Sequence, residues 1–230
     1  GCLFNTFTGN YLNVWIYNII QLPLQALANT TGGILVLALV NQLFWFLGIH
    51  GGMVIEGVRG PLSAAGLAEN ISAVQAGGVA TNILTRGFWT SFVVVGGGGI
   101  TLSLLIAIFI FSKREDHKSI AKFSLIPGIC GINEPIIFGT PIVLNPILSI
   151  PFLIMPCISS GLGYLVQKMG IVSLGYIVDP SFTPFFAQGF LSALDIRNVI
   201  FMFVLIAISV AVYYPFFKVY EKNTLDHEGE

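Results

Sequence analysis

The chain has 230 residues, of which 55% are hydrophobic and only 9% are charged, and its formal net charge at pH 7 is −1. Soluble proteins carry about 25% charged residues, so this composition excludes both an ordinary cytosolic globule and a disordered chain. The charge balance shows no basic excess, which does not favour nucleic acid as a partner. With a mean hydropathy of +0.86 and no Asp, Glu, Lys or Arg before Glu56, the chain is predicted to lie in a lipid bilayer.

The apolar segments are predicted to be membrane helices. Residues 11–28 alternate apolar and polar side chains at helical spacing, which predicts an amphipathic helix along the membrane interface within residues 1–28. Crossing a bilayer takes about 20 apolar residues. Four segments are predicted to do so, namely 31–48, 88–112, 142–166 and 198–217. Residues 29–217 are therefore expected to form a transmembrane domain.

Charged residues are concentrated between two of these segments and after the last one. Residues 112–118 read Ser-Lys-Arg-Glu-Asp-His-Lys, and the chain after residue 217 carries Lys218 and Lys222. The positive-inside rule places both stretches on the cytoplasmic side, so residues 218–230 are predicted to be a cytoplasmic tail.

Two apolar stretches contain too many helix breakers for a straight helix. Residues 127–141 hold three prolines and three glycines, and residues 179–189 begin Asp-Pro-Ser-Phe-Thr-Pro. Irregular backbone at membrane depth is tolerated only where protein or a wet cavity satisfies its amide groups. Both stretches are therefore predicted to be re-entrant hairpins that line a cavity. The expected fold is all-α, with polytopic transmembrane helices and two re-entrant hairpins.

Glu134 is the strongest candidate for a functional residue. A carboxylate in an apolar run costs several kcal/mol unless it is paired or hydrated, so it marks a functional site by default. Pro135 disfavours a helical conformation at Glu134, which is expected to lie on extended or turned backbone at the hairpin tip. The structural alternative is a carboxylate that pairs with a neighbouring helix or reaches the interface.

His50 is the second candidate. It follows the end of the first predicted span and precedes Gly51, so it is expected at a helix C-terminus, which favours an imidazolium. A lone histidine near a helix end is more often structural. Together with Glu134 it would form an acid–base pair in a cavity.

Aromatic residues make up 13% of the chain and offer flat apolar faces to a sugar ring. Trp15 and Trp89 suit an interfacial belt, whereas Trp45 and Phe182 are better placed to contact a ligand. The run of four glycines at 96–99 indicates close packing or a kink.

No cofactor or metal is expected. Three single cysteines, Cys2, Cys130 and Cys157, lie in apolar surroundings and are predicted to be packing residues. The chain has no P-loop, so energy for transport would come from an ion gradient or a partner.

Two motifs resemble a known family. Residues 44–51 read FWFLGIHG and residues 131–139 read GINEPIIFG, followed by PIVLNP at 141–146. They closely resemble the membrane component EIIC of the bacterial phosphoenolpyruvate-dependent phosphotransferase system, of the lactose/cellobiose/chitobiose type. Family members are about twice as long, so the chain resembles a C-terminal half.

The resemblance implies a permease subunit in the bacterial inner membrane that binds a disaccharide, with residues 29–217 as its transmembrane substrate-binding domain. It implies that phosphorylated EIIB, itself served by EIIA, phosphorylates the sugar's C6 hydroxyl. Glu134 and His50 would face that hydroxyl as catalytic residues, and the sugar would also meet Asn133, Trp45, Gly51 and Phe182. The family often has a Trp at the position of Phe182. A homodimer would form through the missing N-terminal half.

Two other functions remain open at this level. In a proton-coupled secondary transporter, Glu134 would carry the coupling proton and the sugar would emerge unmodified. In a membrane sensor or scaffold, the chain would bind a partner without transport.

Overall fold

The computed structural model describes residues 30–228, and for residues 225–228 only the backbone. The predicted interfacial helix of residues 1–28 lies outside the described residues. The described part consists of helices and irregular segments without a strand, so the predicted all-α class is confirmed. Its longer helices are α4 (Thr31–Phe46), α5 (Gly51–Gln75), α7 (Thr101–Phe111), α8 (Glu115–Ile129), α10 (Ser149–Lys168) and α12 (Ile196–Glu228).

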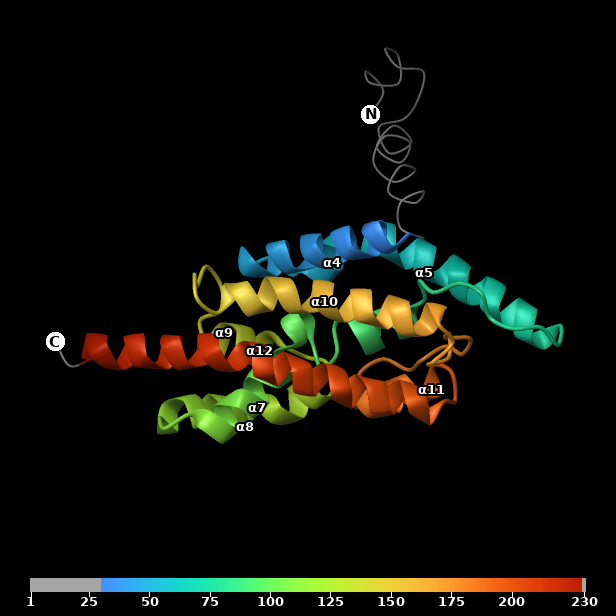
Figure 1. Cartoon of the computed structure of the whole chain (residues 1–230). Coiled ribbons are helices and arrows are strands. Elements are labelled where there is room, and N and C mark those ends of the chain that lie inside the picture. The colour runs from blue at the N-terminus through green and yellow to red at the C-terminus, as the bar shows by residue number, and fades with distance from the viewer. Residues whose placement is uncertain (1–29, 229–230) are drawn as a thin grey trace, which may run out of the picture.

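The helices lie roughly side by side. In Figure 1, α10 lies between α4 and α12, and α7 and α8 flank α12 on its other side. Three segments are long and apolar enough to cross a membrane, namely Arg86–Phe111, Ser149–Lys168 and Ile196–Thr224. The first predicted span, residues 31–48, is shorter than expected, because α4 ends at Phe46 and gives way to a turn in which Gly48 has a φ of +79°.

The segment Arg86–Phe111 is interrupted in its middle. It runs through α6 (Arg86–Phe88), the π-helical turn η2 (Trp89–Val93), a glycine break and the 3-10 turn η3 (Gly98–Ile100) before α7 begins. Gly96, Gly97 and Gly99 have φ values of +63°, +106° and +70°, which disfavour any other residue. The predicted kink at residues 96–99 is therefore confirmed.

The predicted span 142–166 begins too early. Helix α10 starts at Ser149, because the Asn145 side chain accepts hydrogen bonds from the backbone N–H groups of Ile147 and Leu148 at 2.9 Å each. This local arrangement holds residues 145–148 in a turn ahead of the helix.

The first proline-rich stretch contains more helix than predicted. Helix α8 continues through Pro127 and ends at Ile129, and after a turn the short helix α9 (Glu134–Gly139) begins. Pro127 lies so near the end of α8 that its missing N–H costs one hydrogen bond and the helix stops soon after. Pro135 lies in the first turn of α9, where no N–H is needed. Glu134 therefore begins a helix shortly after a turn, which differs from the extended or turned backbone predicted for it.

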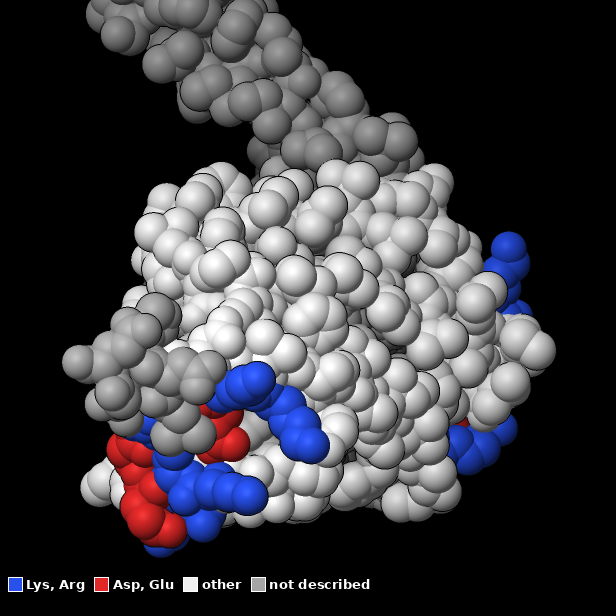
Figure 2. Space-filling model, turned by 60° about the vertical axis from the view of Figure 1, so that its left-hand side comes forward, with Lys and Arg blue, Asp and Glu red and all other residues white. Residues whose placement is uncertain are grey.

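The two charged stretches meet at one end of the molecule. Helix α12 continues without a break into the predicted tail, and its Glu221 accepts hydrogen bonds from the Ser112 hydroxyl and from the backbone N–H of Lys113 at 3.1 Å. Figure 2 shows an almost uncharged surface with a few charged residues at its right-hand edge and a dense group of Lys, Arg, Asp and Glu at its lower left. There the Arg114 guanidinium donates to Asp116 and holds the pKa of that carboxyl well below its usual range.

Candidate functional site

A cavity of about 260 Å³ lies where α4, the start of α5, the glycine break and the turn before α9 meet. Its walls come from parts of the chain that are far apart in sequence. They are formed by Asn41, Trp45, His50, Gly52, Trp89, Val94, Gly97, Gly98, Gly131, Ile132, Asn133, Glu134 and Phe182. Five of the six residues predicted for the site therefore line one cavity. We call this space the first cavity.

His50 and Glu134 face each other across the first cavity. The distance between His50 Nε2 and Glu134 Oε1 is 3.5 Å, and the two side chains are 40% and 41% exposed. Both groups are thus near each other and reachable by a ligand. This is the geometry that an acid–base pair at a reacting hydroxyl requires.

The position of His50 differs from the prediction. Because α4 has already ended, His50 is the N-cap of α5, and its Nδ1 accepts a hydrogen bond from the Met53 N–H at 3.2 Å. The helix C-terminus expected to favour an imidazolium is therefore absent. A neutral ring whose Nδ1 accepts a hydrogen bond carries its proton on Nε2, the atom that faces Glu134.

The glycine break brings the turn before α9 close to the interrupted segment. Asn133 is buried, and its Nδ2 donates to the carbonyl oxygen of Gly98 at 3.4 Å. A Cβ atom on Gly97 would lie 2.7 Å from the Asn133 Cβ, and one on Gly98 would lie 2.8 Å from Asn133 Nδ2. Glycine at these positions is what allows the approach that places Glu134 at the cavity.

The aromatic residues of the first cavity differ in exposure. Trp45 is buried, and its ring lies 4.3 Å from the ring of His50, between centroids, where it fixes one face of the imidazole. Phe182 is 73% exposed and has a φ of +58°. Trp89 is buried and lines the cavity. The belt position predicted for Trp89 is therefore wrong, because the π-helical turn directs it inward.

Gly51 lies behind the cavity wall. A Cβ atom there would approach the Asn41 carbonyl oxygen to 1.9 Å, so glycine permits the close contact of α5 with α4, and its neighbour Gly52 lines the cavity. The sequence reasoning missed Asn41. Its Oδ1 is buried at the cavity wall without a hydrogen-bond partner among the described residues. Polar residues within an apolar helix are the signal that could have found it.

Comparisons with known proteins identify the family of this chain. The model of the family "Phosphotransferase system, EIIC" matches residues 2–156. The lichenan permease IIC component of Bacillus subtilis (strain 168) is 34% identical, over 94% of this chain and 49% of its own length. The cellobiose-specific EIIC component of Lactococcus lactis subsp. lactis (strain IL1403) is 32% identical, over 84% of this chain and 44% of its own length.

A solved structure shows the same fold. The crystal structure of the transporter ChbC, the IIC component from the N,N'-diacetylchitobiose-specific phosphotransferase system, matches with a TM-score of 0.86 and 30% identity, over 99% of this chain and 53% of that one. The chain thus spans about half the length of the relatives it matches. Because the family model covers more than half of the chain, the chain belongs to the EIIC family of the phosphotransferase system, whose members are integral membrane proteins.

Proposed function

We propose that this chain is the substrate-binding part of an EIIC permease that carries a disaccharide across the membrane and presents its C6 hydroxyl to phosphorylated EIIB. The observation that carries the proposal is the pairing of His50 Nε2 with Glu134 Oε1 at 3.5 Å in a cavity walled by aromatic rings. A sugar ring can stack its apolar face on an aromatic side chain while its hydroxyl reaches the two polar groups. Names of relatives point to β-linked glycans and disaccharides as the substrate class.

The proposed reaction moves a phosphoryl group from sulfur to oxygen. The sugar C6 oxygen bonds to the phosphorus of the EIIB phosphocysteine, the P–S bond breaks, and the thiolate leaves. The hydroxyl proton passes to Glu134 Oε1. Because such transfers have a loose transition state, alignment of the oxygen matters more than its early deprotonation.

His50 has an orienting role in this scheme. Its Nε2–H can donate to the C6 oxygen or to Glu134, while Nδ1 stays committed to the Met53 N–H. The ring thus offers a single donor in a direction set by the start of α5 and by the Trp45 ring. Asn133, at the same turn as Glu134, would contact the sugar beside them.

The proposed partners follow from the family. The lactose-specific EIICB component of Staphylococcus aureus (strain N315) is 34% identical over 90% of this chain and 36% of its own length, and its printed name joins the C and B components. We expect EIIB to approach from the end that carries the charged residues. We further propose that the whole protein is a homodimer held by the half of the family length that this chain does not cover, which light scattering in detergent would test.

Uptake into vesicles tests the proposed function. Full-length protein is reconstituted with a labelled panel of cellobiose, chitobiose and lactose, with and without phosphorylated EIIB. The expected product is sugar 6-phosphate, formed only when phosphorylated EIIB is present and lost in the Glu134→Gln variant. Glu69→Gln, which removes an exposed carboxylate of α5 that accepts a hydrogen bond from Asn82 and lies outside the first cavity, serves as the matched control and should leave the product unchanged. Free sugar accumulated under a proton gradient would contradict the proposal.

A further inference from the structure

A second cavity adjoins the first. It measures about 180 Å³ and shares Val94, Gly131 and Phe182 with the first cavity. Its remaining walls carry polar groups, chiefly Arg86, Thr90, Ser181 and Gln188, together with Cys130. The mechanism proposed above uses none of these side chains. A polar cavity that opens beside the proposed reaction site is able to bind another part of the same ligand.

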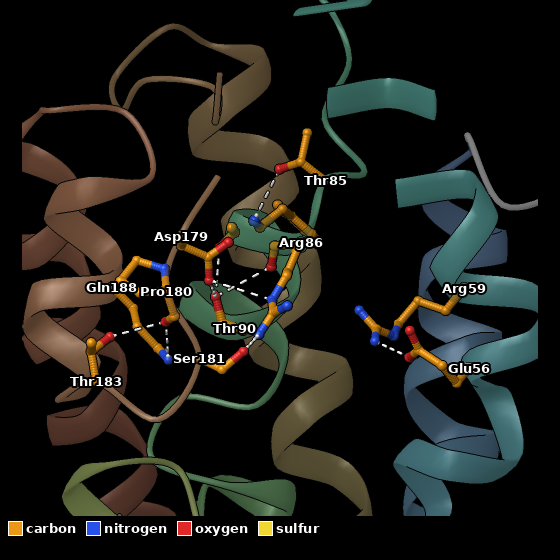
Figure 3. Close-up of polar contacts among 12 residues, drawn as sticks. Glu56, Arg59, Thr85, Arg86, Thr90, Asp179, Pro180, Ser181, Thr183 and Gln188 are labelled. Atoms are coloured by element: carbon orange, nitrogen blue, oxygen red, sulfur yellow. Dashed lines mark hydrogen bonds and ion pairs between the residues drawn. The ribbon is translucent and has the colours of Figure 1, made fainter. Parts of the chain in front are cut away.

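Arg86 is held in place by a buried carboxylate. Its Nε lies 3.7 Å from Asp179 Oδ2, and the Asp179 side chain is fully buried whereas that of Arg86 is 43% exposed. The Thr90 hydroxyl donates to the same carboxylate oxygen at 3.4 Å, and Arg86 also donates to the Ser181 hydroxyl (Figure 3). Burying a carboxylate costs free energy. A buried carboxylate that holds an arginine in one orientation is therefore expected where the guanidinium binds a ligand group at a defined position.

Only part of the guanidinium is used by these contacts. Arginine has five N–H donors in a planar fork, and the contacts with Asp179 and Ser181 leave donors on the exposed side. That side faces the second cavity, which Arg86 lines. A fixed cationic donor at a cavity wall suits hydroxyl and carbonyl oxygens of a neutral polar ligand.

Phe182 forms the partition between the cavities. It lines both, it is largely exposed, and its φ of +58° is unfavourable for a bulky residue. Such strain persists only where the surroundings impose it and is concentrated at ligand sites. Small-molecule sites usually have volumes of about 300 to 1,000 Å³. Neither cavity reaches that range alone, but the two joined at Phe182 do.

We propose that the second cavity is a subsite for the non-reacting ring of the disaccharide, with Arg86 as the donor that selects it. The inference rests on the proposed function, since it assumes that the reacting ring occupies the first cavity. Phe182 would contact the apolar faces at the junction between the rings. Arg86 would hydrogen-bond a ring substituent, and Asp179 is then a positioning residue that acts through Arg86.

Binding measurements with single-ring and two-ring sugars test the subsite. Calorimetry on full-length protein compares the best-binding disaccharide of the panel with the methyl glycoside of its reacting ring. Arg86→Gln is expected to weaken disaccharide binding by about 10- to 100-fold, the usual effect of losing a charge-assisted hydrogen bond, and to leave the methyl glycoside within about twofold. Arg197→Gln is the matched control, because Arg197 also pairs with one largely buried aspartate, at 2.8 Å, but lies outside both cavities.

Cys130 provides a second measurement that needs no variant. It lines the second cavity, whereas Cys157 lines neither, so alkylation of the two thiols can be followed separately by peptide mass spectrometry. Saturating disaccharide is expected to slow alkylation of Cys130 but not of Cys157, and saturating methyl glycoside is expected to slow neither.

The outcomes separate the subsite from the function it rests on. If both sugars bind but protect Cys130 equally, or if Arg86→Gln weakens both sugars alike, the subsite is wrong while the reaction site stands. If the disaccharide binds and leaves Cys130 unprotected, the subsite is also wrong. If no sugar of the panel binds at all, the proposed function fails, and the subsite fails with it.

Discussion

The described part of the chain contains two histidine–carboxylate pairs with nearly the same separation and opposite surroundings. His50 and Glu134 are 3.5 Å apart, and each side chain is about two-fifths exposed at the first cavity. His117 and Glu221 are 3.6 Å apart at the charged end, and their side chains are 6% and 11% exposed. The second pair is enclosed by Phe217 and Tyr220, whose ring stacks on that of His117.

The difference shows that access and hydrogen bonding, rather than the pair itself, distinguish a pair that a ligand can reach from a structural contact. Glu221 has its oxygen occupied by the Ser112 hydroxyl and the Lys113 N–H, so it fastens the start of α8 to α12. Glu134 has no comparable set of hydrogen bonds with the residues that the structure describes, and His50 has one ring nitrogen committed to Met53 and the other turned toward the cavity. The first pair can act on a ligand, and the second holds two helices together.

The largest expected effect comes from removing the charge of Glu134. Glu134→Gln should lower phosphoryl transfer to the sugar by about 10²- to 10⁴-fold, the usual contribution of a general base, because the amide cannot accept the hydroxyl proton. Sugar binding measured by calorimetry should change little, since the side chain keeps its shape. Transfer at the normal rate would place the base elsewhere and would remove the distinction between the two pairs.

Two substitutions of His50 separate its two contacts. His50→Asn keeps an N-cap acceptor for α5 but removes the donor that faces Glu134, and should lower transfer by about 10- to 100-fold. His50→Ala removes both and should also lower the stability of the protein by about 1 kcal/mol relative to His50→Asn. Transfer assays and thermal unfolding in detergent measure the two effects. Equal stability of the two variants would mean that the cap contributes nothing.

The second pair should give the opposite pattern. Glu221→Ala leaves the Ser112 hydroxyl and the Lys113 N–H without their buried acceptor and should cost about 1 to 3 kcal/mol of stability. Transfer at a temperature where the variant is folded should be unchanged. A loss of transfer with unaltered stability would show that the buried pair takes part in the reaction cycle.

The smallest effect is expected at Asp195, a carboxylate that pairs with Arg197 and belongs to neither histidine–carboxylate pair. Although burial opposes the shift, hydrogen bonds from Arg197 and Ser173 lower the pKa of Asp195 to about 2. A carboxylate with a lowered pKa stabilises the fold above its unfolded pKa of about 3.9, and this contribution is lost as the pH falls through 2. Asp195→Asn should therefore reduce stability by less than about 1 kcal/mol at pH 6, and the difference from wild type should shrink between pH 4 and pH 2. A difference in stability between Asp195→Asn and wild type that stays constant from pH 4 to pH 2 would contradict the expected direction of this pH dependence.

Much of the candidate site followed from the sequence because its residues violate the apolar pattern around them. Glu134 and His50 stand out as polar groups in runs that otherwise suit lipid, and the structure places both at one cavity. The kink at residues 96–99 was predictable for a similar reason, since four consecutive glycines cannot maintain a regular helix.

Other features depended on contacts that no local pattern contains. The pairing of Arg86 with Asp179 joins residues 93 positions apart, and both look like unremarkable charged residues near segment ends. The end of α4 at Phe46 was missed because residues 47–49 are as apolar as the helix before them. That error, together with the helix α5 that the sequence analysis did not predict, reversed the prediction for His50, which moved from the end of one helix to the start of the next.

The glycine break also connects α12 to the turn that carries Glu134. Where the helix is interrupted, two adjacent carbonyl groups are free to accept from other elements: Gly98 from the Asn133 side chain, and Gly99 from the Tyr213 hydroxyl of α12 at 2.6 Å. The turn that carries Glu134 and the helix α12 are thereby tethered to neighbouring peptide units of a third segment. A shift of α12 can therefore reach that turn through those two units, so a helix that does not line the first cavity can influence the position of the Glu134 carboxylate.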